Sequence, residues 1–189
     1  MSTDNKTLKQ YEYLQQKLGI DISEFNIDQL IQLDCGFKNN LSIEQVQMYA
    51  DPKYNDEQMF EIRSGLENGL SMEQIQIYAN PKYKWQQMYE ISRGLQYGLS
   101  MEQIQMYATT DYNWKQMKQI RYGFENGLSM DQVQMYADPK YNSYQMDEIL
   151  IGLKNHLPMD QIQLYADSKY RWNQMEQIRS GFEYGLSIE

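Results

Sequence analysis

An eleven-residue segment returns along this chain of 189 residues at a constant interval. It reads GLSMEQIQIYA at residues 69–79, GLSMEQIQMYA at 98–108, GLSMDQVQMYA at 127–137 and HLPMDQIQLYA at 156–166. Aligning the chain on itself gives a period of 29 residues without gaps. A period of this length is typical of proteins in which each unit buries its apolar face against neighbouring units.

The first part of each unit is expected to form a short helix. In the copy that starts at Leu70, Ser71 is followed three residues later by Gln74, which is the spacing of a capping box. Apolar residues then follow with helical spacing on one face: Met72, Ile75 and Ala79. Ile77 is apolar on the opposite side, so we expect this helix to be sandwiched between neighbours.

A second, longer helix is predicted over residues 84–97. The segment ANPKY before it ends the short helix, because proline lacks an amide donor. Its apolar stripe consists of Met88, Ile91 and Leu95. Gly98 takes the position of a left-handed C-terminal cap. Gly94 lies inside the helix at a cost of about 1 kcal/mol relative to alanine, so we expect another helix to cross there too closely for a Cβ.

These signals predict an all-α fold, an α-solenoid of two-helix 29-residue repeats with an N-terminal helical cap. Residues 1–40 form the cap and a half repeat, with one helix ending at Gly19 and containing Leu8. Residues 41–185 form five repeats, and residues 186–189 begin a truncated sixth. We expect that end to lack a polar cap, which makes it a surface for homodimer formation.

Charge and cysteine content narrow the partners and the compartment. The formal net charge is −9, whereas binding through phosphate neutralisation needs clustered lysine and arginine. The single Cys35 fits a reducing compartment. With no basic leader and no 18-residue apolar run, a soluble protein located in the cytoplasm is expected.

The residues needed for catalysis are mostly lacking. The only histidine and the only cysteine are His156 and Cys35, so neither a metal cluster nor a histidine-based triad can be assembled. Acid pairs such as Glu57 with Glu61, or Asp147 with Glu148, are expected to lie on solvated helix faces. We therefore predict no catalytic residue, no metal, no cofactor and no enzymatic activity.

Positions that differ between copies mark a candidate recognition surface on the second helices. They follow i, i+4, i+7 spacing and so share one face, which we call the variable ribbon. Tryptophan, tyrosine and arginine, the types that dominate interface energies, are frequent there. The predicted partner-binding residues are Phe60, Arg63, Trp85, Tyr89, Trp114, Lys118, Arg121, Leu150, Trp172 and Arg179. The alternative is that the tryptophans simply cover the edge of the core.

Regular glutamines and tyrosines have two interpretations. Gln76, Gln87 and their equivalents either hydrogen-bond between units or read bases one per unit, as in some RNA-binding helical repeats. The tyrosine series through Tyr78 and Tyr83 favour core and inter-unit packing with the hydroxyl at the edge. A stacking platform for bases is the alternative.

The pattern GLSMEQIQxYAxPKYxWxQMxxIRxG resembles helical repeats in accessory proteins of bacterial mobile elements, and more loosely those of phage-encoded anti-CRISPR inhibitors. This resemblance implies a non-catalytic protein that docks on a protein or nucleoprotein complex and blocks a host defence nuclease. The residues leave two alternatives open, a repeat that binds single-stranded nucleic acid and an architectural or oligomerising spacer.

Overall fold

Residues 3–186 are described by the computed structural model, without the side chains of residues 3–8 and of residue 10. All regular elements in this described part of the chain are helical, which confirms the all-α class. The chain divides into two compact units, Met1–Gln96 and Tyr97–Glu189. The short helix expected after Gly185 and the side chain of Leu8 lie outside the described residues.

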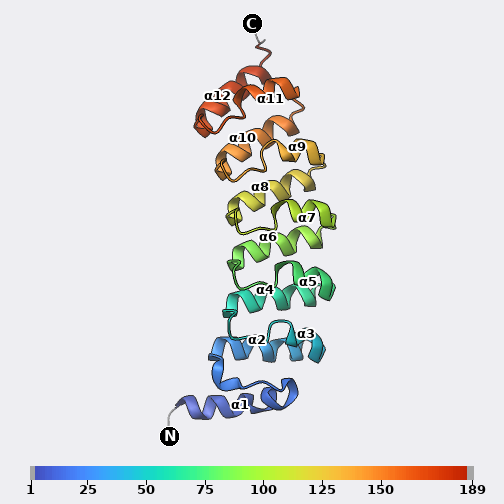
Figure 1. Ribbon diagram of the computed structural model, residues 1–189, viewed down its shortest axis with the longest axis vertical. Helices are drawn as coiled ribbons and strands as arrows, with labels where there is room; N and C mark the ends of the chain where they lie inside the picture. The colour runs from blue at the N-terminus through green and yellow to red at the C-terminus, as the bar shows by residue number, and fades with distance from the viewer. Residues whose placement is uncertain (1–2, 187–189) are drawn as a thin grey trace. The chain divides into compact units, whose positions relative to one another are not determined.

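In the first unit, long helices pack successively against one another, and each short helix packs on the long helices next to it (Figure 1). The N-terminal helix packs on the first long helix and the first short one. The elements are α1 (Thr3–Leu18), the 3₁₀ helix η1 (Ile22–Glu24), α2 (Ile27–Lys38), α3 (Ile43–Gln47), α4 (Asp56–Glu67), α5 (Met72–Tyr78) and α6 (Trp85–Gln96).

The second unit is built in the same way. Its long helices α8, α10 and α12 pack in order, and short helices lie against them. The elements are α7 (Met101–Tyr107), α8 (Trp114–Glu125), α9 (Met130–Gln134), α10 (Ser143–Lys154), α11 (Met159–Tyr165) and α12 (Trp172–Glu183). In both units the starts of the long helices from α4 onwards are 29 residues apart.

The predicted start and stop signals are confirmed. The Ser71 hydroxyl accepts from the Gln74 amide at 3.3 Å, and Gln74 Oε1 accepts from the Ser71 amide at 2.9 Å. Gly98 has φ +81°, in the left-handed region that favours glycine. His156 takes the same cap position with φ +58°. The following Pro158 caps α11 without a side-chain hydrogen bond, so this junction is the irregular one that the sequence indicates.

The core follows the predicted stripe of the long helices but not that of the short ones. Met88, Ile91 and Leu95 are buried, as expected. In α5 the buried side chains are Ile75 and Tyr78, while Met72 is 36% exposed and Ala79 caps the helix end. The predicted face of α5 was therefore wrong in part, because a seven-residue helix buries its tyrosine in place of its two ends.

The helical glycines make room for a tyrosine hydroxyl and not for a crossing backbone. A Cβ on Gly65 would overlap the hydroxyl of Tyr78, which comes from the next short helix and donates to the Glu61 carbonyl at 3.3 Å. The same arrangement pairs Gly36 with Tyr49, Gly123 with Tyr136 and Gly152 with Tyr165. The expected close helix crossing is thus corrected, and these hydroxyls lie inside the core instead of at its edge.

Glutamines on the long helices tie consecutive repeats together within each unit. Gln58 Nε2 donates to the carbonyls of Pro81 at 3.1 Å and Tyr83 at 2.5 Å. Corresponding bonds are made by Gln29, Gln116 and Gln145. This confirms inter-unit hydrogen bonding for the Gln87 series, whereas Gln76 is exposed on α5.

Candidate binding site

Two grooves open between successive long helices at equivalent positions of the repeat. The first has a volume of about 310 Å³, and the second, two periods later along the chain, has about 200 Å³. We call the first the acidic groove; its lining is Gln32, Asp56, Glu57, Phe60, Glu61 and Trp85. We call the second the basic groove; its lining is Trp114, Lys115, Lys118, Gln119, Ser143, Tyr144 and Asp147. One geometric position thus carries opposite charge in the two units.

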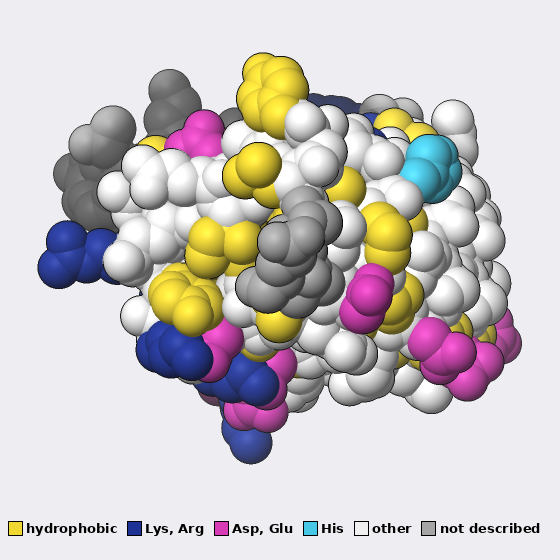
Figure 2. Space-filling view, turned by 90° about the horizontal axis from the view of Figure 1, so that it is seen from above, with side chains coloured by type: hydrophobic (Ala, Val, Ile, Leu, Met, Phe, Trp, Pro, Cys, Tyr) yellow, Lys and Arg dark blue, Asp and Glu magenta, His cyan; other side chains and the backbone are white. Residues whose placement is uncertain are grey.

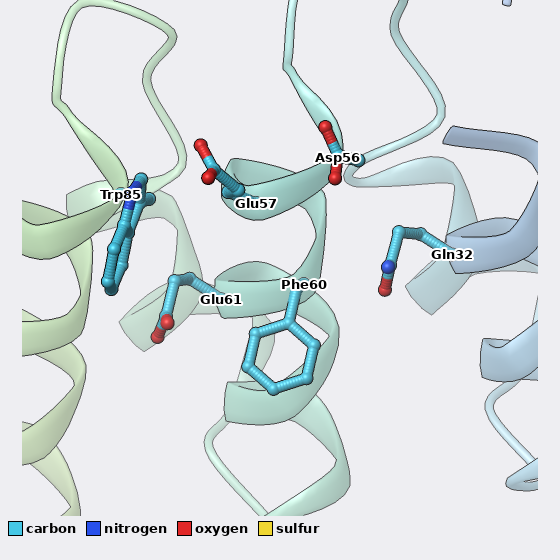
Figure 3. A pocket seen from close by; sticks show the side chains of 6 residues that line it. All are labelled: Gln32, Asp56, Glu57, Phe60, Glu61 and Trp85. Carbon is cyan, nitrogen blue, oxygen red and sulfur yellow. The ribbon is translucent and has the colours of Figure 1, made fainter. Parts of the chain in front are cut away.

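The acidic groove combines carboxylates with aromatic rings. Asp56 and Glu57 lie on the first turn of α4, and Phe60 and Glu61 lie one turn later (Figure 3). In the view of Figure 3, Glu61 lies between Phe60 and the indole of Trp85, which projects from α6. Carboxylates beside aromatic faces attract cations, since the ring face carries negative electrostatic potential.

Glu61 is the most perturbed acid of this groove. It is only 6% exposed. Burial, together with the charge of Glu90 on α6, raises the pKa of Glu61 to about 7. An acid in this environment loses its charge near neutral pH unless a cation holds it ionised.

The basic groove presents ammonium groups against aromatic rings. Lys115 Nζ lies 5.5 Å from the centroid of a Trp114 ring, and Lys118 Nζ lies 5.2 Å from that of Tyr122. Asp147 faces these cations, yet burial outweighs their effect and raises the pKa of its carboxyl. The groove therefore combines positive charge with apolar surface.

Several predicted partner-binding residues have surfaces open to a partner. Phe60 is 44% exposed, Tyr89 41% and Trp172 45%. Trp85, Trp114 and Lys118 are partly buried in the walls of the two grooves. Both interpretations of the tryptophans fit this intermediate exposure.

The other predicted residues are buried, with their side chains already engaged. Arg63 contacts Gln32 and Glu67, Arg179 contacts Glu148 and Glu183, and Arg121 pairs with Glu125. Leu150 is 3% exposed. Whether these four contact a partner stays a prediction.

The expected solvation of the acid pairs was wrong for one member of each. Glu61 and Glu148 are buried because the next long helix packs over their side of the helix. Sequence reasoning also missed Gln32, Glu57, Glu61 and Tyr144 as groove residues. The available signal was Ser92, which stands where Arg63 and Arg179 stand in other copies.

Hydrophobic surface also gathers on the helices α11 and α12. Leu164 is 46% exposed, and Tyr184 and Leu186, directly after α12, are 91% and 65% exposed. Figure 2 looks onto this end and shows hydrophobic side chains spread among polar ones. Homodimer formation through this end stays a prediction.

Comparisons of the chain with protein-family models, with curated proteins and with solved structures found no match. Among the described residues, no group of three or more histidine, cysteine, aspartate or glutamate side chains is placed to hold a metal ion. Within that same part of the chain, every helix is too short or too polar to cross a membrane. The residues of the two grooves therefore carry the functional interpretation.

Proposed function

We propose that this chain is a non-catalytic helical-repeat protein, an α-solenoid in the cytoplasm, which binds a protein partner through the variable ribbon. The observation that carries this proposal is the pair of grooves at one repeat position with different linings. Repeated buried residues maintain the frame, whereas the groove residues change from copy to copy. Such variation on a constant frame is how repeat proteins acquire specific binding surfaces.

The chemistry of the grooves favours a folded or extended protein segment as the partner. Exposed aromatic rings offer large area at low entropic cost, and the flanking charges of opposite sign define an orientation. A partner that presents a cation to the acidic groove and an anion to the basic groove would be recognised at both. Inhibition of a nucleoprotein complex, which the resemblance to anti-CRISPR repeats implies, is one form that this binding takes.

Direct binding of single-stranded nucleic acid is supported less well. The net charge is −9, and the acidic groove would repel phosphates. The glutamines best placed for a ladder, such as Gln58, are occupied by carbonyls of the next repeat. Absence of any shift of labelled oligonucleotides at low salt is the expected result.

Affinity capture with defined variants tests the proposal. The tagged full chain is compared with Phe60→Ala, which changes the acidic groove, and with Lys118→Glu, which changes the basic groove. Gln76→Ala, exposed on α5 and away from both grooves, is the matched control. We expect at least one captured protein to be retained by the control and lost about tenfold or more by a groove variant. Equal capture by all four proteins would instead favour an architectural spacer.

A further inference from the structure

Arginines bridge successive long helices in one register of this chain. In the first unit, Arg63 Nε donates to Gln32 Oε1 at 3.1 Å. In the second unit, Arg179 Nε donates to Glu148 Oε2 at 2.9 Å. Both pairs are 31 residues apart, and each arginine also pairs with a glutamate four residues later on its own helix.

This bridge is missing at Glu61. Ser92 stands in the arginine register, and its hydroxyl donates to the Tyr89 carbonyl at 3.0 Å. The glutamate four residues later is replaced as well, by Gln96. Glu61 is 6% exposed, and its carboxylate has neither a hydrogen bond nor an ion pair among the described residues. A buried carboxylate is thus left without the cation that the fold supplies elsewhere.

The second unit shows that the groove and the missing arginine belong together. There Leu150 stands in the arginine register opposite Gln119. Gln119 Oε1 is buried without a hydrogen-bond partner in the described part of the chain, and Gln119 lines the basic groove. Replacing a long arginine by a shorter side chain leaves volume unfilled, which accounts for a groove at both registers.

We propose that the acidic groove binds an arginine side chain from a basic segment of the partner protein, with the guanidinium on Glu61 between Phe60 and Trp85. This inference rests on the proposed function and names the chemistry of one contact. A guanidinium is planar, bonds carboxylates through parallel N–H groups and stacks on aromatic rings. The bound arginine would restore for Glu61 the contact that Arg179 gives to Glu148.

Other occupants fit less well. The described acids are not placed to hold a metal ion, as noted above. The nearby Arg63 is neutralised by Glu67 at 2.6 Å, and its guanidinium lies 5.2 Å from the Phe60 centroid. That contact shows that the Phe60 ring accepts a guanidinium in this environment. Asp56 and Glu57 add negative charge at the mouth of the groove, which favours a cationic segment over a neutral one.

Nuclear magnetic resonance of the full chain tests the site with a small probe. The indole N–H signal of Trp85, assigned with Trp85→Phe, reports binding of the peptide acetyl-Gly-Arg-Gly-amide. The peptide with citrulline in place of arginine is the uncharged control, and a lysine peptide tests selectivity. We expect a saturable shift with the arginine peptide and about tenfold or weaker binding of the two others.

Variants separate the site from its surroundings. Glu61→Gln is expected to weaken the arginine peptide about tenfold or more, because it removes the charged acceptor. Ser92→Arg with Gln96→Glu rebuilds the internal bridge and is expected to abolish the shift by occupying the groove. Glu12→Gln, exposed on α1, is the matched control and keeps wild-type binding.

Three outcomes would overturn the inference. They are no saturable shift with the arginine peptide, equal binding of citrulline or lysine, and unchanged binding by Glu61→Gln. Circular dichroism checks that the rebuilt variant folds; if it does not, Glu61→Gln alone decides. The proposed function fails separately, when no captured protein depends on the grooves. A partner lost by Phe60→Ala but kept by the folded rebuilt variant would refute the arginine site and leave the function standing.

Discussion

Arg179 and Glu148, 31 residues apart, form an ion pair that is buried on both sides, with side chains 10% and 9% exposed. The pair joins α12 to α10. Burying two charges is expensive, so the pair contributes to specificity of packing as much as to stability. Breaking it from one side, however, leaves an uncompensated charge in the interior.

Arg179→Ala is therefore expected to destabilise the second unit by about 3 kcal/mol. The matched control is Lys169→Ala, which breaks the exposed pair between Lys169 and Asp167 at 2.8 Å. Its expected cost is below about 1 kcal/mol, because exposed pairs are screened by solvent. Thermal and urea unfolding measure both, and equal losses would contradict the assigned role of burial.

Gly65→Ala is expected to destabilise the chain by about 1–3 kcal/mol through overpacking, although alanine normally favours a helix. The added Cβ overlaps the Tyr78 hydroxyl. Combining it with Tyr78→Phe removes the obstructing oxygen and is expected to recover at least half of the loss. A double-mutant cycle from urea unfolding gives the coupling, and additive losses would show that the hydroxyl is not the obstacle.

Gln58→Met is expected to cost about 2–3 kcal/mol, since it leaves the buried carbonyls of Pro81 and Tyr83 unpaired. Gln174→Met is the matched control at the equivalent position. Both glutamines accept a helix-cap bond at 2.9 Å, but Gln174 is exposed and has no carbonyl acceptor for Nε2 in the described residues. Urea midpoints that shift equally would assign the loss to capping alone.

Glu61→Gln is expected to stabilise the protein at pH 8 by about 1–3 kcal/mol and to leave it nearly unchanged at pH 4. Because the pKa of Glu61 is raised to about 7, its proton stabilises the fold below pH 4.5, and this contribution is lost as pH rises through 7. Glu90 on α6 and Asp56 and Glu57 on α4 are the neighbouring acids that oppose its ionisation.

Glu73→Gln provides the contrasting control for this pH dependence. Hydrogen bonds from its own backbone amide and the Ser71 hydroxyl lower the pKa of Glu73, so its stabilising contribution is present at high pH. This variant is expected to gain nothing at pH 8. Urea unfolding from pH 4 to 8 measures both variants, and parallel curves for Glu61→Gln and the wild type would contradict the buried carboxylate.

Local features were predictable from the sequence because nearby residues determine them. The capping box of Ser71 and Gln74, the buried stripe through Met88 and the left-handed Gly98 all depend on spacing within one helix. Each was read without knowledge of any neighbouring helix. The period of 29 residues supplied the order of the elements in the same way.

Features that depend on the adjacent repeat were not predictable in the same way. Projection onto one helix places Glu61 and Arg63 on its surface, but does not tell which flank the next long helix covers. The role of Gly65 likewise depends on a tyrosine thirteen residues later, whose hydroxyl reaches back into the helix. The alternation of arginine with Ser92 and Leu150 contained the signal, and its meaning required the pairing across repeats.

The glutamine bonds from Gln58 reach 23 and 25 residues along the chain, and the arginine bridge reaches 31. An unequal genetic exchange between two copies therefore adds or removes one whole period while leaving every such bond with an acceptor at the same interval. Chain length is then free to change by recombination, and a new copy brings a new groove for selection to modify. Insertions of any other size would sever these bonds and be eliminated.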